Sequence, residues 1–209
     1  MAISGHPFLS IPAAMAAGML SGLITGVLQT KMGIDSLLSG IIVNTALYSI
    51  NIAVMGNSSL LNLNKTETIF TMLKSAFAGT AFAASYKTVI VLIAVAVVVV
   101  FLTLFLGTRL GLAIRATGNN PDMVRSSSIN PVFTTLVGLC VANAFTALSG
   151  CMLGQLQKSV NIDIGTGMVT MALASLLIGR AFMGKGPVSV RAVGAVVGAI
   201  IFRIVYAIA

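Results

Sequence analysis

The amino-acid sequence predicts an all-α fold, a polytopic transmembrane helix bundle with about six membrane-spanning or re-entrant helices. Of the 209 residues, 57% are hydrophobic and only 8% are charged, whereas a soluble domain carries about 25% charged residues. The mean hydropathy of +1.06 points the same way. Long apolar runs rich in Ala, Leu and Gly recur along the chain, and they lack the alternation that is typical of strands.

Six of these runs are long enough to cross or enter a bilayer, which takes about 20 residues of helix. They cover residues 8–29, 36–56, 88–107, 132–156, 164–183 and 190–209. Two longer connections, 57–87 and 108–131, separate them. We expect helices in the runs and a single transmembrane domain over residues 1–209.

The charged residues give the expected orientation. They lie singly between the runs and form no basic face, so the net charge of +8 indicates a membrane orientation and not nucleic-acid binding, because positive residues stay on the cytoplasmic side. With residues 108–131 in the cytoplasm, the cytoplasmic cations are Lys31, Arg109, Arg115, Arg125, Arg180, Lys185 and Arg191, and the external cations are Lys65, Lys74, Lys87 and Lys158. This orientation makes residues 57–87 an external segment and places both termini outside.

The first run contains Gly18, Gly22 and Gly26 at four-residue spacing, and the last run contains Gly194 and Gly198. Small residues at this spacing let helix backbones approach closely in lipid. We therefore expect tight helix–helix packing at these glycines and assign them no ligand.

The second run carries Asn44, Tyr48 and Asn51 on one helical face. Polar side chains within lipid face the bundle or a wet cavity. Two interpretations stay open, which are a stripe along a substrate path and hydrogen bonds between helices.

In the external segment, Thr66 precedes a helical pattern through Phe70, Leu73 and Phe77, which predicts a short amphipathic helix on the surface. Such a helix could dock a soluble partner or rest on its own bundle.

The connection 108–131 contains a helix-start signal. Asn120 is a good N-cap, Pro121 suits the first helical position, and Asp122 favours the positive helix start. Because Asn130 precedes a proline, where helix is disfavoured, we expect a helix of about two turns between them. A rigid, polar helix in a cytoplasmic loop is a binding surface for another protein.

The fifth run opens with Gly165, Thr166 and Gly167 close to Asp163. Glycines on both sides of a threonine permit irregular backbone at membrane depth, which is tolerated only beside protein or water. A re-entrant helix near a translocation path and an ordinary helix start are the two interpretations. Arg203, in the last run, could reach the membrane surface or pair inside the bundle.

Catalytic and metal chemistry find little support in the sequence. Residues 179–186, "GRAFMGKG", resemble a phosphate-binding loop, but Gly186 stands where that loop needs Ser or Thr. Cys140 and Cys151 share one apolar run, which indicates small core residues and neither a disulfide nor a metal site. The four acids lie at the ends of runs or in connections, and there is one histidine. We expect no catalytic residue, no metal and no carboxylate for ion coupling.

Longer stretches resemble a known family. The run "TRLGLAIRATGNNPDMVRSSSIN" resembles the cytoplasmic coupling loop of inner-membrane permeases of ABC importers, in the branch that serves branched-chain amino acids. The runs "GIIVNTALYSINIAVMG", "MVTMALASLLIGRAFMG" and "VGAIIFRIVYAIA" resemble segments of its tryptophan/tyrosine-type subgroup. The resemblance covers most of residues 18–209.

The resemblance implies a bacterial inner-membrane, multi-pass permease subunit that moves a small solute such as an amino acid. It implies three partners besides the lipid bilayer: an ABC ATPase subunit, an extracytoplasmic solute-binding protein and a second permease subunit, expected as a homodimer. ATP would be bound by the ATPase, so the chain itself would need no cofactor. The residues expected to couple to the ATPase are Arg115, Asn119, Asn120, Pro121, Asp122, Met123 and Arg125.

The sequence departs from the family pattern in three ways. Ser128 stands where many members have Gly, and Arg180 stands where an acid is common. The pattern also extends beyond both ends, so we expect a chain that begins inside it and stops before its end. A secondary transporter and a membrane scaffold or fragment without transport are the alternative functions.

Overall fold

A computed structural model describes residues 7–64, 66–76, 86–165, 167–184 and 187–208. Within them, five helices are long and apolar enough to cross a membrane by length and composition: α1 (Ser10–Thr30), α2 (Ser36–Val54), α4 (Tyr86–Gly107), α7 (Pro131–Gln157) and α9 (Val188–Ile208). The remaining expected run, 164–183, forms a shorter apolar helix, α8 (Met168–Met183). The predicted helical membrane fold is therefore confirmed.

Shorter elements fill the connections. They are α3 (Ile69–Ala76), α5 (Arg109–Asn119), α6 (Pro121–Ser126), a 3-10 helix at Ile162–Gly165 and the strands β1 (Leu60–Asn62) and β2 (Ser159–Asn161). The strands pair antiparallel, with Leu60 opposite Asn161 and Asn62 opposite Ser159. The sequence did not predict this ladder, which joins segments that lie about 100 residues apart and outside the apolar runs.

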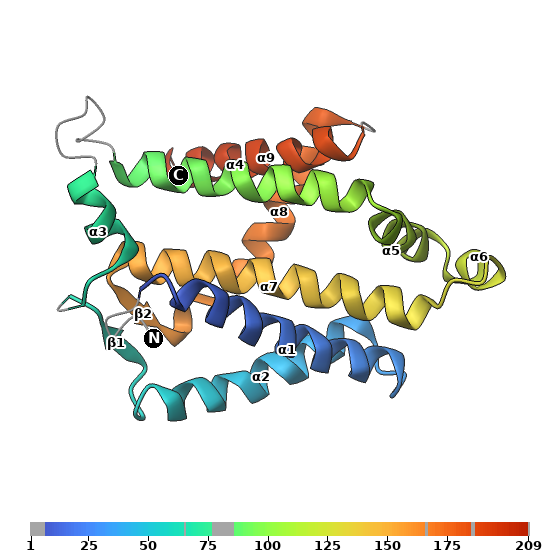
Figure 1. The fold of residues 1–209 in the computed structure, drawn as a ribbon, viewed down its shortest axis with the longest axis horizontal. Coiled ribbons are helices and arrows are strands. Elements are labelled where there is room, and N and C mark those ends of the chain that lie inside the picture. Colours follow the sequence, from blue (N-terminus) through green and yellow to red (C-terminus); the bar gives the residue numbers. More distant parts are fainter. Residues whose placement is uncertain (1–6, 65, 77–85, 166, 185–186, 209) are drawn as a thin grey trace. The chain divides into compact units, whose positions relative to one another are not determined.

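The chain divides into two compact units, and the first comprises Met1–Leu92 and Ala113–Ile162. In this unit α1 and α7 run side by side in opposite directions (Figure 1). A Cβ atom added at Gly18 would lie 2.5 Å from the backbone oxygen of Asn143, and one at Gly22 would lie 2.5 Å from that of Leu139. The predicted close approach at these glycines is confirmed, because no side chain fits there without moving α7.

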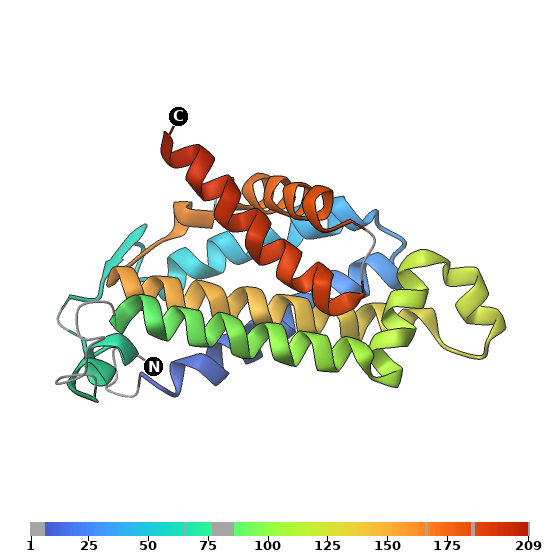
Figure 2. The same ribbon diagram turned by 90° about the horizontal axis from the view of Figure 1, so that it is seen from above.

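The second unit comprises Ile93–Leu112 and Asp163–Ala209. Here α8 and α9 pack antiparallel (Figure 2). A Cβ atom at Gly198 would lie 2.6 Å from the backbone nitrogen of Gly179, and one at Gly194 would lie 3.2 Å from the oxygen of Gly179. Glycines of both helices therefore meet, which confirms the packing expected of the last run. Gly179, the first residue of the loop-like pattern, packs inside this helix pair, whereas Lys185 and Gly186 lie outside the described residues.

Candidate functional site

The N-terminus of α6 is built by the residues that the sequence indicated. The Asn120 side-chain oxygen accepts hydrogen bonds from the backbone N–H groups of Asp122 and Met123, both at 3.1 Å. Pro121 is the first helical residue, where its missing N–H costs no hydrogen bond. The predicted cap is confirmed.

The C-terminus of α6 is closed by backbone hydrogen bonds. The Ile129 N–H donates to the Val124 carbonyl and the Ser128 N–H donates to the Arg125 carbonyl, both at 3.2 Å, the pattern of a Schellman motif. Ser128 has φ +61°, a left-handed conformation that favours glycine. The helix is six residues long, which is about two turns as predicted, and this motif ends it four residues before Asn130.

The side chains of α6 divide into one anchor and an exposed set. Val124 is 3% exposed, whereas Met123 is 67% exposed. The side chains of Arg125 and Asp122 are 70% and 89% exposed and form an ion pair at 3.8 Å, which contributes little in water. Figure 1 shows α6 beyond the ends of α1 and α7. One buried residue therefore holds a short helix whose other side chains are free to meet a partner.

A helix that the sequence reasoning missed precedes α6. The Thr108 hydroxyl accepts a hydrogen bond from the Gly111 N–H at 3.2 Å and begins α5, a capping signal that could have been found. Arg115 and Asn119, two of the expected coupling residues, are exposed on α5. Further along, the Thr117 and Thr134 hydroxyls lie 2.7 Å apart and join α5 to α7.

Asn130 also begins a helix. Its side chain accepts hydrogen bonds from the N–H groups of Val132 and Phe133, and Pro131 is the first residue of α7. The Asn-Pro signal of α6 is thus used twice, and the second use starts a membrane-spanning helix.

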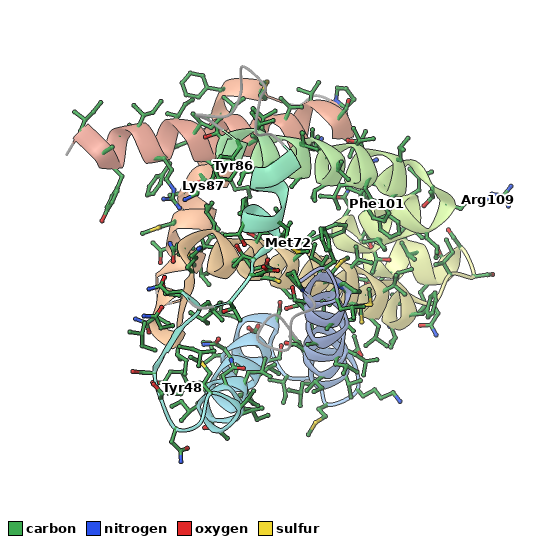
Figure 3. The ribbon with its side chains drawn as sticks, turned by 60° about the vertical axis from the view of Figure 1, so that its left-hand side comes forward. Tyr48, Met72, Tyr86, Lys87, Phe101 and Arg109 are labelled. Carbon is green, nitrogen blue, oxygen red and sulfur yellow. The ribbon has the colours of Figure 1, made fainter. Side chains whose placement is uncertain are left out.

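Asn44, Tyr48 and Asn51 are all exposed on α2, and Tyr48 is 45% exposed. Figure 3 shows Tyr48 projecting from α2. In the described part of the chain, none of the three side chains forms a hydrogen bond to another helix, so that interpretation finds no support here. Their place along a substrate path stays a prediction.

Irregular backbone precedes α8, as the glycines predicted. A 3-10 turn ends at Gly165, and Gly167 has φ +81° directly before the helix. Thr166 lies outside the described residues. With 16 residues, α8 is about 24 Å long, which is short for a complete span. A role of this segment in translocation stays a prediction.

The start of α3 packs on its own bundle. Ile69 and Phe70 are buried, and the Ile69 N–H donates to the side-chain oxygen of Gln155 in α7 at 3.0 Å. Thr68 and Thr71 cap this helix, whereas the Thr66 hydroxyl donates to the Leu63 carbonyl in the preceding turn. The helix start expected at Thr66 is therefore corrected to Ile69. Phe77 lies outside the described residues.

Gln155 is a buried polar residue that the sequence reasoning missed. It is 3% exposed, and its amide nitrogen donates to the Ser10 hydroxyl at 2.8 Å. One side chain therefore joins the starts of α1 and α3 to the end of α7. Cys151 lies 3.6 Å from the same hydroxyl as a free thiol. No sequence signal identifies these contacts, since Ser10 and Gln155 lie 145 positions apart.

Ionisable side chains form no cluster at these places. Arg180 and Arg203 are exposed, and neither has an ion pair within the residues that the structure describes. No group of three His, Cys, Asp or Glu that could bind a metal was found there.

Comparison with known proteins gives matches along the whole sequence. The family described as the permease component of branched-chain amino acid transport systems matches residues 1–209. The chain is 32% identical to the tyrosine transport system permease protein of Clostridioides difficile (strain R20291) over 94% of its own length and 63% of that protein. It is 28% identical to the uncharacterized protein RP368 of Rickettsia prowazekii (strain Madrid E) over 80% of its length and 56% of that protein. No solved structure matches the chain.

Proposed function

The chain belongs to the family of permease components of branched-chain amino acid transport systems, and on that premise we propose that it is the membrane-spanning subunit of an ATP-binding cassette importer for an amino acid. The family and the five apolar helices make it a multi-pass protein of the bacterial inner membrane. The chain spans 63% and 56% of the lengths of the two curated relatives, so the importer's activity, solute and partners are part of the proposal.

The observation that carries the proposal is α6. It is closed at both ends by its own residues, anchored by Val124 and otherwise exposed. We infer that Asn119, Asn120, Pro121, Asp122, Met123 and Arg125 contact a cleft of a separate ATPase subunit, with Arg115 beside them. A helix that is capped at both ends can be displaced without unfolding. A coupling element between the ATPase and the bundle requires this property.

The placement of the acids supports an ATP-driven importer over an ion-coupled transporter. None of the four acids falls inside the five long helices, whereas proton- or sodium-coupled carriers place carboxylates at membrane depth. The energy would therefore come from the partner ATPase. The relative's name mentions tyrosine, and we propose an amino acid as the solute, delivered by a binding protein on the opposite side and passed along Asn44, Tyr48 and Asn51 between two permease subunits.

The test is a charge reversal in α6, Arg125→Glu, within the reconstituted importer with its ATPase and binding protein. We expect the stimulation of ATP hydrolysis by solute-loaded binding protein to fall at least tenfold, about the effect of removing one charge-assisted contact. Arg109→Glu, a reversal at an exposed arginine outside α6, is the matched control and should retain stimulation. Normal stimulation in Arg125→Glu would contradict the assignment, and unchanged uptake would favour a scaffold.

A further inference from the structure

A groove lies in the first unit between the end of α1, α5, α6 and the start of α7. Its volume is about 560 Å³, and Arg125 and Thr30 line it together with Ile114 and Leu139. Arg125 is exposed on α6, whereas Ile114 of α5 and Leu139 of α7 are half-buried. The groove is therefore cationic at one side and apolar at the other.

The lining of the groove changes from polar to apolar along α7. Thr135 lines the groove one turn into the helix, and Leu139 lines it one turn further, about 6 Å deeper. The Thr135 hydroxyl forms no hydrogen bond within the described residues. A ligand that fills this space must accept hydrogen bonds at its outer end and present hydrocarbon at its inner end.

Charge at this end of the unit is mostly positive. Lys31 directly follows α1, Arg115 is exposed on α5, and Arg125 stands at the groove. The acids at this end are Asp35, which caps α2 through the Leu37 N–H, and Asp122, whose ion pair with Arg125 is exposed at 3.8 Å. Because a guanidinium has five N–H donors, this single weak pair leaves most of them available.

We propose that the groove holds one anionic phospholipid, with its phosphodiester at Arg125 and an acyl chain against Ile114 and Leu139. The groove sits where α1 ends and a membrane-spanning helix begins, which is the level of lipid headgroups. Guanidinium groups bind phosphate oxygens in a bidentate manner. A lipid held there links α6 to the bundle beyond the contact made by Val124. The proposal depends on membrane insertion and not on the solute that the chain transports.

The experiment uses the absence of tryptophan in the sequence. Val132→Trp, at a position of α7 that lines the groove, and Leu104→Trp, at an exposed position of α4, each place a single fluorophore in the full chain. Each variant is reconstituted into phosphatidylcholine vesicles in which either phosphatidylglycerol or phosphatidylcholine carries brominated chains. For Val132→Trp we expect about a fivefold binding preference for phosphatidylglycerol, the factor that one surface cation supplies. For Leu104→Trp the preference should be near one.

Two further substitutions, each combined with either fluorophore, separate the groove from general attraction to surface cations. Thr135→Leu narrows the groove, removes the Thr135 hydroxyl and keeps every charge, and Arg125→Gln removes the proposed phosphate partner. We expect each to abolish the preference measured with the groove fluorophore of Val132→Trp. Quenching of the α4 fluorophore of Leu104→Trp should stay unchanged and report that the chain is still inserted in the vesicle membrane.

Three results would overturn the proposal. One is an equal response of the groove fluorophore to both lipids. Another is a preference that survives Thr135→Leu, which would mean attraction to exposed cations alone. The third is displacement by millimolar glycerol phosphate, which would mean a soluble phosphate ligand. Since quenching needs no ATPase and no solute, failure of the importer assignment would leave this measurement unaffected.

Discussion

At one end of the first unit, β1 and the start of α3 form hydrogen bonds to residues at and just after the end of α7. At the other end, the hydrogen bonds that hold α6 come mainly from its own flanking residues. The first end uses the β1–β2 ladder and the Gln155 side chain, whose partners lie far along the sequence. The second uses Asn120 and the backbone motif at Ser128, whose partners lie within five residues. Figure 1 shows these two segments at opposite ends of α7.

The difference separates a segment that completes the fold from one that is available to a partner. Residues such as Thr68, Ile69 and Phe70 are buried by the contacts that hold them. In α6 only Val124 is buried, and the local caps satisfy the backbone without covering the side chains. Local capping is therefore the feature that allows a polar helix to be both ordered and exposed.

The largest expected effect on folding stability is at the end of the unit where Gln155 holds α3. Gln155→Leu leaves the buried Ile69 N–H without an acceptor, which should cost about 2 kcal/mol of folding free energy. We expect a lower thermal unfolding midpoint in detergent and faster protease cleavage between β1 and α3. Gln157→Leu changes an exposed glutamine two residues away and should leave both unchanged. Equal behaviour of the two variants would mean that Gln155 does not hold this segment.

An intermediate effect is expected at the start of α6. Asn120→Ala removes the cap, which should cost about 1 kcal/mol of local stability and accelerate hydrogen exchange at the Asp122 and Met123 amides about fivefold. Asn119→Ala, at the neighbouring asparagine, is the control because that side chain forms no hydrogen bond within the described residues. The rest of the chain should keep its exchange rates, since the cap is local.

The smallest effect has the opposite sign. Ser128→Gly relieves the cost of the left-handed backbone, about 1 kcal/mol, part of which the greater freedom of glycine in the unfolded chain offsets. We expect exchange at the Ile129 amide to slow about twofold for a net gain of about 0.5 kcal/mol. Ser126→Gly, inside α6, should accelerate exchange instead. Faster exchange in Ser128→Gly would show that serine is already unstrained there.

The same contrast explains which features could be predicted from the sequence. The Asn120 cap and the contacts of Gly18, Gly22, Gly194 and Gly198 depend on spacing within a few residues, and they were predicted. Asn130 was interpreted as a helix end although it caps α7, because one Asn-Pro signal marks both the end of the preceding segment and the start of the next helix.

Contacts over long sequence separations could not be predicted. Gln155 reaches Ile69 across 86 positions, and periodicity carries no information about such a pairing. For Asn44, Tyr48 and Asn51 the pattern predicted a shared face of α2, but it does not say which surface that face meets. The substrate-path role of these three residues rests on their shared face in an apolar run, and the coupling role of the α6 residues rests on the resemblance. Both stay predictions.

The glycines of α1 also have a consequence for how the chain is made. The ribosome adds about 5–20 residues per second, and Pro131 follows Thr30 by 101 positions. The synthesis of α7 therefore begins about 5–20 s after that of α1 ends. During this interval the glycine face of α1 is open to lipid or to the insertion machinery. The α8–α9 pair needs no such delay, because its halves emerge one after the other.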